Sequence, residues 1–151
     1  MYKVRPIDKD YMQNNTMILL VDDRPENLLT LESILSEDHR TFLSATSGAE
    51  ALIMTGLEKI DLILLDYRLD DMTGIDVAHA LRKQPATSHI PIVLVTALSK
   101  REIPDLSDFE AGTIDVLNKP LDLEEARAKI AIFEEMTFLY KDSFNMRRGR
   151  Y

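Results

Sequence analysis

The chain has 151 residues, of which 45% are apolar and 29% are charged. This balance is expected of one globular domain with its own core and not of a disordered tail. The net charge of −8 argues against general nucleic-acid binding, because contacts to a phosphate backbone require clustered lysine and arginine. The sequence contains no cysteine, which excludes disulfide bonds, thiolate zinc sites and thiol nucleophiles.

The first residues predict an N-terminal tail, residues 1–15, that shows no export signal. The segment from Met1 to Thr16 is polar and charged, and it lacks the apolar core of a signal peptide. The longest apolar runs have the length of strands and are too short to cross a membrane. We therefore expect a cytoplasmic protein that binds neither a membrane nor nucleic acid directly.

Three short, almost continuous apolar runs predict strands that are buried on both faces, as in a parallel sheet covered by helices. They comprise residues 17–21, 62–65 and 92–95. Two weaker strands are predicted over residues 40–45 and 113–118.

The segments between these strands show helical spacing and signals for helix starts. Pro25, tolerated in a first helical turn, precedes the apolar stripe Leu28, Leu31 and Leu35. Ser47 and Glu50 have the spacing of a capping box, and Asp122 is expected to cap the last helix. A further apolar stripe after Gly74 consists of Ile75, Ala78 and Leu81.

Strand and helix alternate about five times, which predicts a parallel α/β sandwich with right-handed crossovers. One crossover is weak: residues 98–112 contain Pro104 and few apolar side chains. The helix of that crossover is expected to be short or mobile.

The last helix is predicted to be longer than the sheet requires. One apolar row with heptad spacing consists of Ala126, Ile130, Phe133, Thr137, Tyr140 and Phe144, and a second row consists of Ile132, Met136 and Leu139. A helix that is apolar on two sides usually has a neighbour on each. We therefore assign residues 16–135 to the domain and residues 136–151 to a helical extension and tail that forms a homodimer or contacts an output domain.

The residues that carry chemistry follow the strands, at the edge where ligands bind in open parallel sheets. Taken singly, each has an ordinary structural explanation, such as a turn or a helix cap. Together they bring three carboxylates, a hydroxyl and an ammonium group to one crevice, which favours a functional site. The set consists of Asp22, Asp23, Asp66, Thr96, Ala97, Lys119 and Pro120.

Carboxylates at such close range repel one another unless a cation lies among them. A site with oxygen ligands and no thiolate or imidazole indicates a hard ion, with Mg²⁺ the natural choice and Mn²⁺ an alternative. Magnesium binds phosphate oxygens, Thr and Lys donate to them, and a carboxylate can become an aspartyl-phosphate. The sequence therefore predicts phosphoryl chemistry.

The combined motif resembles the receiver domains of two-component response regulators. It consists of Val21-Asp22-Asp23, Leu65-Asp66-Tyr67, Val95-Thr96-Ala97 and Asn118-Lys119-Pro120. The resemblance covers about residues 16–135 and implies a flavodoxin-like (βα)5 doubly wound parallel sheet with strand order 2-1-3-4-5.

The resemblance also implies the role of each site residue. Asp66 would accept the phosphoryl group from the phosphohistidine of a histidine kinase or phosphotransfer protein. Asp23, Asp66 and the main-chain carbonyl of Arg68 would bind the ion directly, and Asp22 would bind it through water. Thr96 and Lys119 would contact phosphoryl oxygens, Ala97 would leave the donor a path, and the Lys119–Pro120 bond would be cis. Switching would involve residues 98–112, the fifth strand and the last helix.

Three positions depart from the pattern that many receivers share. Val116 stands where an aromatic switch residue is common, and Asp70, beside Asp71, stands where a proline is common. Arg68 could pair either with the phosphoryl group or with Asp70 or Asp71. The three histidines show no metal-ligand spacing and are expected on the surface or on helix faces.

Two other functions compete with this interpretation. A pseudo-receiver keeps the fold as an interaction module without phosphorylation, but this chain retains the acidic residues and the lysine. An aspartyl-nucleophile Mg²⁺ phosphohydrolase of the haloacid-dehalogenase type requires a second Asp where this chain has Arg68. We therefore expect a switch that assists only its own phosphorylation and dephosphorylation, and not an enzyme.

Overall fold

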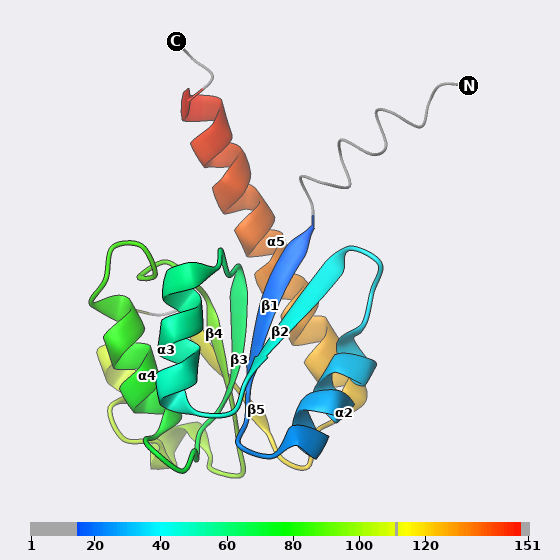
Figure 1. Ribbon diagram of the computed structural model, residues 1–151, viewed down its shortest axis with the longest axis vertical. Coiled ribbons are helices and arrows are strands. Elements are labelled where there is room, and N and C mark those ends of the chain that lie inside the picture. Colours follow the sequence, from blue (N-terminus) through cyan, green and yellow to red (C-terminus); the bar gives the residue numbers. More distant parts are fainter. Residues whose placement is uncertain (1–14, 111, 149–151) are drawn as a thin grey trace.

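The computed structural model describes residues 15–110 and 112–148 and contains one parallel sheet of five strands (Figure 1). The strands are β1 (Thr16–Val21), β2 (Arg40–Ala45), β3 (Leu62–Asp66), β4 (Ile92–Thr96) and β5 (Ile114–Asn118). Their order is β2-β1-β3-β4-β5, which confirms the expected flavodoxin-like order. Every residue of β3 and β4 is buried, as their continuous apolar sequence predicts.

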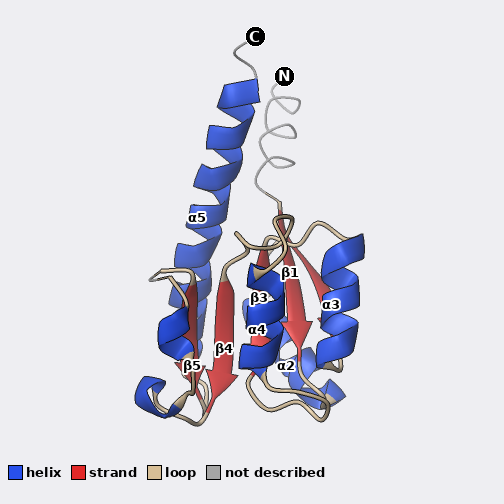
Figure 2. Ribbon diagram, turned by 90° about the vertical axis from the view of Figure 1, so that its left-hand side faces the viewer, coloured by secondary structure: helices blue, strands red, loops and turns tan. Residues whose placement is uncertain are grey.

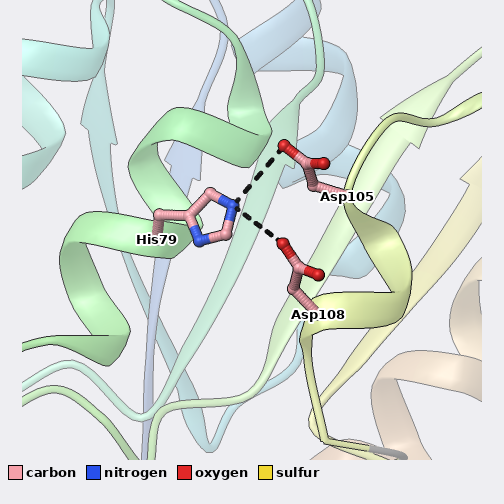
Figure 3. A group of neighbouring side chains, drawn as sticks. All are labelled: His79, Asp105 and Asp108. Atoms are coloured by element: carbon pink, nitrogen blue, oxygen red, sulfur yellow. Dashed lines mark ion pairs between the residues drawn. The ribbon is translucent and has the colours of Figure 1, made fainter.

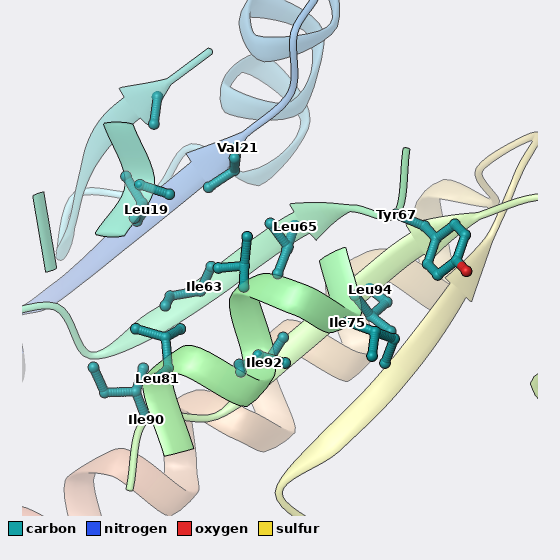
Figure 4. Packing of buried hydrophobic residues seen from close by; sticks show 14 of the residues in the cluster. Leu19, Val21, Ile63, Leu65, Tyr67, Ile75, Leu81, Ile90, Ile92 and Leu94 are labelled. Carbon is teal, nitrogen blue, oxygen red and sulfur yellow. The ribbon is translucent and has the colours of Figure 1, made fainter. Parts of the chain in front are cut away.

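Two helices pack on each face of the sheet. On one face, α3 (Gly48–Leu57) and α4 (Gly74–Arg82) bury Ala51 together with the predicted stripe Ile75, Ala78 and Leu81 (Figures 2 and 4). On the other, α2 (Pro25–Leu35) and α5 (Leu123–Arg148) bury the stripe Leu28, Leu31 and Leu35 with Ala126, Ile130 and Phe133. The parallel α/β sandwich expected from the alternation of elements is confirmed.

The predicted helix starts use their caps. The Ser47 hydroxyl accepts from the Glu50 amide at 3.0 Å, while the Glu50 carboxylate reaches back to the amide of Thr46 at 2.7 Å. In a standard capping box the Glu50 carboxylate would accept from the amide of Ser47. Here it accepts from the amide of Thr46, one residue earlier. Asp122 accepts from the Glu125 amide at 2.9 Å, which satisfies a free donor at the start of α5.

The connection from β4 to β5 differs from a complete (βα)5 repeat. Within its described residues it contains no α-helix, only two 3₁₀ turns, η1 (Lys100–Glu102) and η2 (Leu106–Asp108). The helix that we expected to be short or mobile is thus reduced to these two short turns. Pro104 interrupts the segment, and Asp105 adopts a left-handed backbone with φ of 63°, which ends any regular helix. Buried Ile103 anchors the connection on the core.

The long last helix is confirmed, and its two apolar rows have different environments. The first row is buried at Ala126, Ile130, Phe133 and Thr137, whereas Ile132, Met136 and Leu139 of the second row are 61%, 41% and 59% exposed. The side chains of Tyr140 and Phe144 lie outside the described residues. In both views α5 continues past the edge of the sheet (Figures 1 and 2). In the described part of the chain, no helix is apolar enough over sufficient length to span a membrane.

A buried ion pair fixes α5 to the start of the sheet. Arg40 on β2 donates to both carboxylate oxygens of Glu134, at 3.1 and 2.8 Å. Thr16 donates a hydrogen bond to the same carboxylate, and His39 lies 3.0 Å from it. Burial alone would raise the pKa of Glu134, but the hydrogen bonds from Arg40, Thr16 and His39 outweigh it and hold that pKa below 4.5.

We expect Glu134→Gln to destabilise the fold by about 3–5 kcal/mol, because it leaves the buried Arg40 charge without its partner. The folded-state pKa of Glu134 is lowered, so the stability it contributes is fully present at neutral pH. That contribution is lost as the pH falls through the lowered folded-state pKa of Glu134. Urea unfolding at pH 7 and at pH 4 measures both effects.

The control is Glu26→Gln, which breaks the exposed pair between Arg24 and Glu26. It should cost less than about 1 kcal/mol. Equal losses in the two variants, or a Glu134→Gln loss that does not shrink in acid, would contradict the assignment.

Candidate functional site

Three carboxylates meet at the edge where the parallel strands end. Asp22 and Asp23 follow β1, and Asp66 is the last residue of β3. Because β1 and β3 are neighbours in the sheet, their carboxyl ends lie side by side. One oxygen from each of the three carboxylates lies within 4.8 Å of the others.

The two acidic residues after β1 have different surroundings. Asp22 is buried and accepts from the Arg24 amide at 3.0 Å and from the Asn27 side-chain amide at 3.2 and 3.3 Å. These bonds link the turn to the first helical turn of α2. Asp23 is half-buried and lies beside Asp70, and a hydrogen bond with Asp23 raises the pKa of Asp70. The contacts of Asn27 and Asp70 were not predicted from the sequence.

Asp66 is buried, with 8% of its surface exposed. Burial raises the pKa of Asp66, and the negative charges of Asp22 and Asp23 raise it further. The Lys119 ammonium donates to Asp66 Oδ1 at 3.1 Å and partly offsets these effects. The predicted nucleophile and the predicted lysine are therefore in direct contact.

The ends of β4 and β5 complete the edge. The Thr96 hydroxyl accepts from the Leu98 amide at 3.1 Å, and the Thr96 carbonyl accepts from the Lys119 amide at 2.9 Å. Asn118 joins the same two turns, since its side chain donates to the carbonyls of Thr96 and Leu98 at 3.1 and 2.7 Å. The Lys119–Pro120 peptide bond is cis, and Ala97 is exposed.

The loop after Asp66 is held by its own backbone and by α3. Gly74 donates to the Tyr67 carbonyl at 2.7 Å, and Leu69 donates to the Met72 carbonyl at 3.2 Å. Neither bond uses the carbonyl of Arg68, which stays available to a ligand. A Cβ atom at Gly74 would lie 2.8 Å from the Leu94 side chain and 3.0 Å from the Asp66 carbonyl oxygen, so only glycine fits this approach.

The acidic pair after Arg68 has roles that the sequence did not reveal. Both oxygens of Asp71 accept from the first amides of α3, those of Gly48 and Ala49, at 2.9 Å each. These bonds lower the pKa of Asp71 and satisfy free donors at a helix start. Asp70 lies against Asp23. Arg68 is exposed, and in the described part of the chain its side chain forms no salt bridge with Asp70 or Asp71.

The donor set fits a hard divalent cation. Three carboxylates converge, and the single ammonium of Lys119 cannot balance them. Oxygen ligands, few in number and open to water on one side, match the coordination that Mg²⁺ prefers. Asp23, Asp66 and the Arg68 carbonyl are the residues that would hold the ion, and Asp22 lies behind them.

Comparisons with known proteins agree with this geometry. The sequence model of the response regulator receiver domain matches residues 18–131. The chain is 39% identical over 105 residues to the response regulator PleD of Caulobacter vibrioides, a match that covers 70% of this chain and 23% of PleD. It is 34% identical over 113 residues to a probable cyclic di-GMP phosphodiesterase of Vibrio cholerae, covering 75% of this chain and 25% of that protein.

Solved structures show the same architecture. A two-component response regulator from Clostridium difficile superposes with a TM-score of 0.68 at 29% identity, covering 78% of this chain and 94% of that one. The chain belongs to the response regulator receiver domain family. It spans about a quarter of the length of the two curated relatives described above.

We expect Asp23→Ala to stabilise the metal-free fold, because it removes one of three mutually repelling carboxylates. The gain should be on the order of 1 kcal/mol, or roughly 2–4 °C in melting temperature for a chain of this size. Added Mg²⁺ should stabilise the wild type and not the variant.

Asp22→Ala is the matched comparison. It removes the same charge but also the bonds to the Arg24 amide and the Asn27 side chain, so it should gain less or lose stability. Calorimetry with and without Mg²⁺ measures both variants. A sharp drop in melting temperature for metal-free Asp23→Ala would contradict the proposed repulsion.

Proposed function

We propose that this receiver domain is a phosphoacceptor switch in which Asp66 takes a phosphoryl group from the phosphohistidine of a histidine kinase or phosphotransfer protein. The observation that carries the proposal is the position of the Asp66 carboxylate. Its Oδ1 atom lies 3.1 Å from the Lys119 ammonium, and one of its oxygens lies within 4.8 Å of an oxygen of Asp22 and of Asp23. The Asp66 oxygen attacks phosphorus, the P–N bond to the donor imidazole breaks, and an acyl phosphate forms.

Each site residue has a defined part in this transfer. A bound magnesium ion would neutralise charge on the phosphoryl oxygens. Lys119 turns its ammonium from the Asp66 carboxylate to a phosphoryl oxygen, and exposed Ala97 leaves the donor an open approach. Arg68, also exposed, can reach the phosphoryl group from the side.

The proposed switch begins at Thr96. Its hydroxyl now accepts from the Leu98 amide at 3.1 Å, and it would donate its own hydrogen to a phosphoryl oxygen. A movement of the hydroxyl toward that oxygen would lengthen or break the bond from Leu98. Any movement there is passed directly into residues 98–110 and, through Lys119 and Asn118, into the end of β5. Val116 is 3% exposed and packs in the core, so in this chain no aromatic ring rotates at that position.

We infer that the chain turns over no substrate other than its own phosphoryl group. The relatives include proteins named as cyclic di-GMP phosphodiesterases, but the chain matches only about a quarter to a third of their length. In the proposed cycle Asp66 takes up a phosphoryl group at the sheet edge and becomes a free carboxylate again when that group is lost. This reversible change is the chemistry of a switch.

We expect wild-type protein to gain the mass of one phosphoryl group with acetyl phosphate and Mg²⁺, and Asp66→Asn to gain none, since an amide is not a nucleophile here. Intact-mass spectrometry measures the gain. Asp38→Asn, at the opposite end of the sheet beside the start of β2, is the control and should be labelled like the wild type. Labelling of Asp66→Asn to the same extent would rule out this phosphoacceptor.

A second copy of the chain is the proposed partner of the exposed row on α5. Ile132, Met136 and Leu139 have the 3.5-residue spacing of a helix pair. Ile132 and Met136 line a shallow hollow together with Ala131 and Glu135. Leaving these side chains in water costs roughly 1.5–3 kcal/mol for each large one. A two-fold axis along this row buries it against itself.

We expect a dimer whose dissociation constant rises at least tenfold when Ile132 and Leu139 are both changed to Glu. These residues are exposed in the single chain, so the change spares the buried row. Light scattering over a range of concentrations measures the effect. Leu57→Glu, at a still more exposed leucine on α3, is the control. A wild type that stays monomeric at all concentrations would remove the proposal.

A further inference from the structure

A second group of metal-ligating side chains lies outside the phosphoacceptor site. His79 comes from α4, and Asp105 and Asp108 come from the connection between β4 and β5 (Figure 3). One ligand atom of each lies within 4.8 Å of the other two. The group was not predicted, because 26 residues of sequence separate His79 from Asp105 and only the fold brings them together.

The three side chains do not form hydrogen bonds with one another. His79 Nε2 lies 4.0 Å from Asp105 Oδ2 and 3.9 Å from Asp108 Oδ2, beyond the range of about 2.7–3.2 Å for a hydrogen bond. Two carboxylates carry two negative charges, and one imidazole can carry at most one positive charge. The group is therefore negative in either protonation state of His79, with its three ligand atoms turned toward a common centre.

The separation of these atoms suits a small ion with mixed nitrogen and oxygen ligands. Zinc binds histidine nitrogen and carboxylate oxygen at about 2.0–2.2 Å, which places two ligands of one tetrahedral ion roughly 3.4 Å apart. A contraction of about half an ångström would bring His79 Nε2 to that separation from each of the two carboxylates. Both aspartates are exposed, so their side chains can make this adjustment.

The imidazole is already oriented by its neighbour. The Phe109 ring packs against His79 with ring centroids 4.8 Å apart and an angle of 35° between the planes. This contact limits the rotation of the ring, and Figure 3 shows its Nε2 atom turned toward both carboxylates. Buried Ala78 and Ile103 anchor the two elements in the same core, which reduces the ordering that an ion must bring about.

We propose that His79, Asp105 and Asp108 form a site for a divalent transition-metal ion, for which zinc is the best match. An imidazole ligand favours zinc, copper or nickel over magnesium, so this site and the carboxylate site at the sheet edge select different ions. Three protein ligands leave a coordination position for water. The ion ties the 3₁₀ connection to α4 and holds in place the segment that follows Thr96.

The test is zinc titration by calorimetry with Mg²⁺ in excess, on protein carrying Asp23→Asn and Asp66→Asn so that the carboxylate site does not contribute. One zinc ion per chain should bind. Adding His79→Gln or Asp108→Asn should weaken binding at least tenfold, while His89→Gln, at a histidine outside the group, should not. Circular dichroism confirms that each variant is folded.

A second readout is amide exchange. Zinc should slow amide exchange at residues 103–109 in the background protein, the one that carries Asp23→Asn and Asp66→Asn. It should have no such effect when His79→Gln is added. The absence of saturable zinc binding, or binding that His79→Gln leaves unchanged, overturns the proposal. Neither result depends on phosphorylation, because the background protein has no phosphoacceptor.

Discussion

Three carboxylates at one edge of a buried sheet repel one another, and the packing of the whole domain holds them together against that repulsion. β1 and β3 are hydrogen-bonded neighbours whose side chains are buried on both faces, so the residues after them cannot move apart without opening the core. Lys119 offsets part of the charge at Asp66. The remaining excess of negative charge at this edge favours a divalent cation there.

The sequence predicted the strands and the main site residues for one physical reason. A strand buried on both faces is almost entirely apolar, so Asp66 or Thr96 at its end marks the edge of the sheet. The contacts between loops are different. The hydrogen bond of Asp71 to the start of α3 and the contact of Asp70 with Asp23 depend on the conformations of loops. The spacing of apolar residues in the sequence does not encode these conformations. The connection 98–112 was predicted as a short helix because alternation suggested one, whereas Pro104 and the left-handed Asp105 decide its actual form.

Two contacts in the first half of α5 hold this helix against opposite edges of the sheet. Near its start, Lys129 pairs with Asp115 at 3.5 Å and donates to the Val116 carbonyl at 2.6 Å. Further on, Glu134 is fixed to Arg40 at the opposite edge of the sheet. The helix is thus attached at both edges of the sheet, so a shift of β5 reaches it at Lys129 while Glu134 acts as the pivot.

The connection between β4 and β5 is the element on which both proposed sites act. At its beginning, the Thr96 hydroxyl accepts from the Leu98 amide, a bond that a movement of Thr96 toward a phosphoryl oxygen would lengthen or break. At its middle, Asp105 and Asp108 face His79 on α4. Short 3₁₀ turns have poorer hydrogen-bond geometry than an α-helix, so side-chain contacts such as that of buried Ile103 with the core help to hold this segment in place. An ion at His79 would oppose a displacement that begins at Thr96, so the two sites are coupled through the segment that they share.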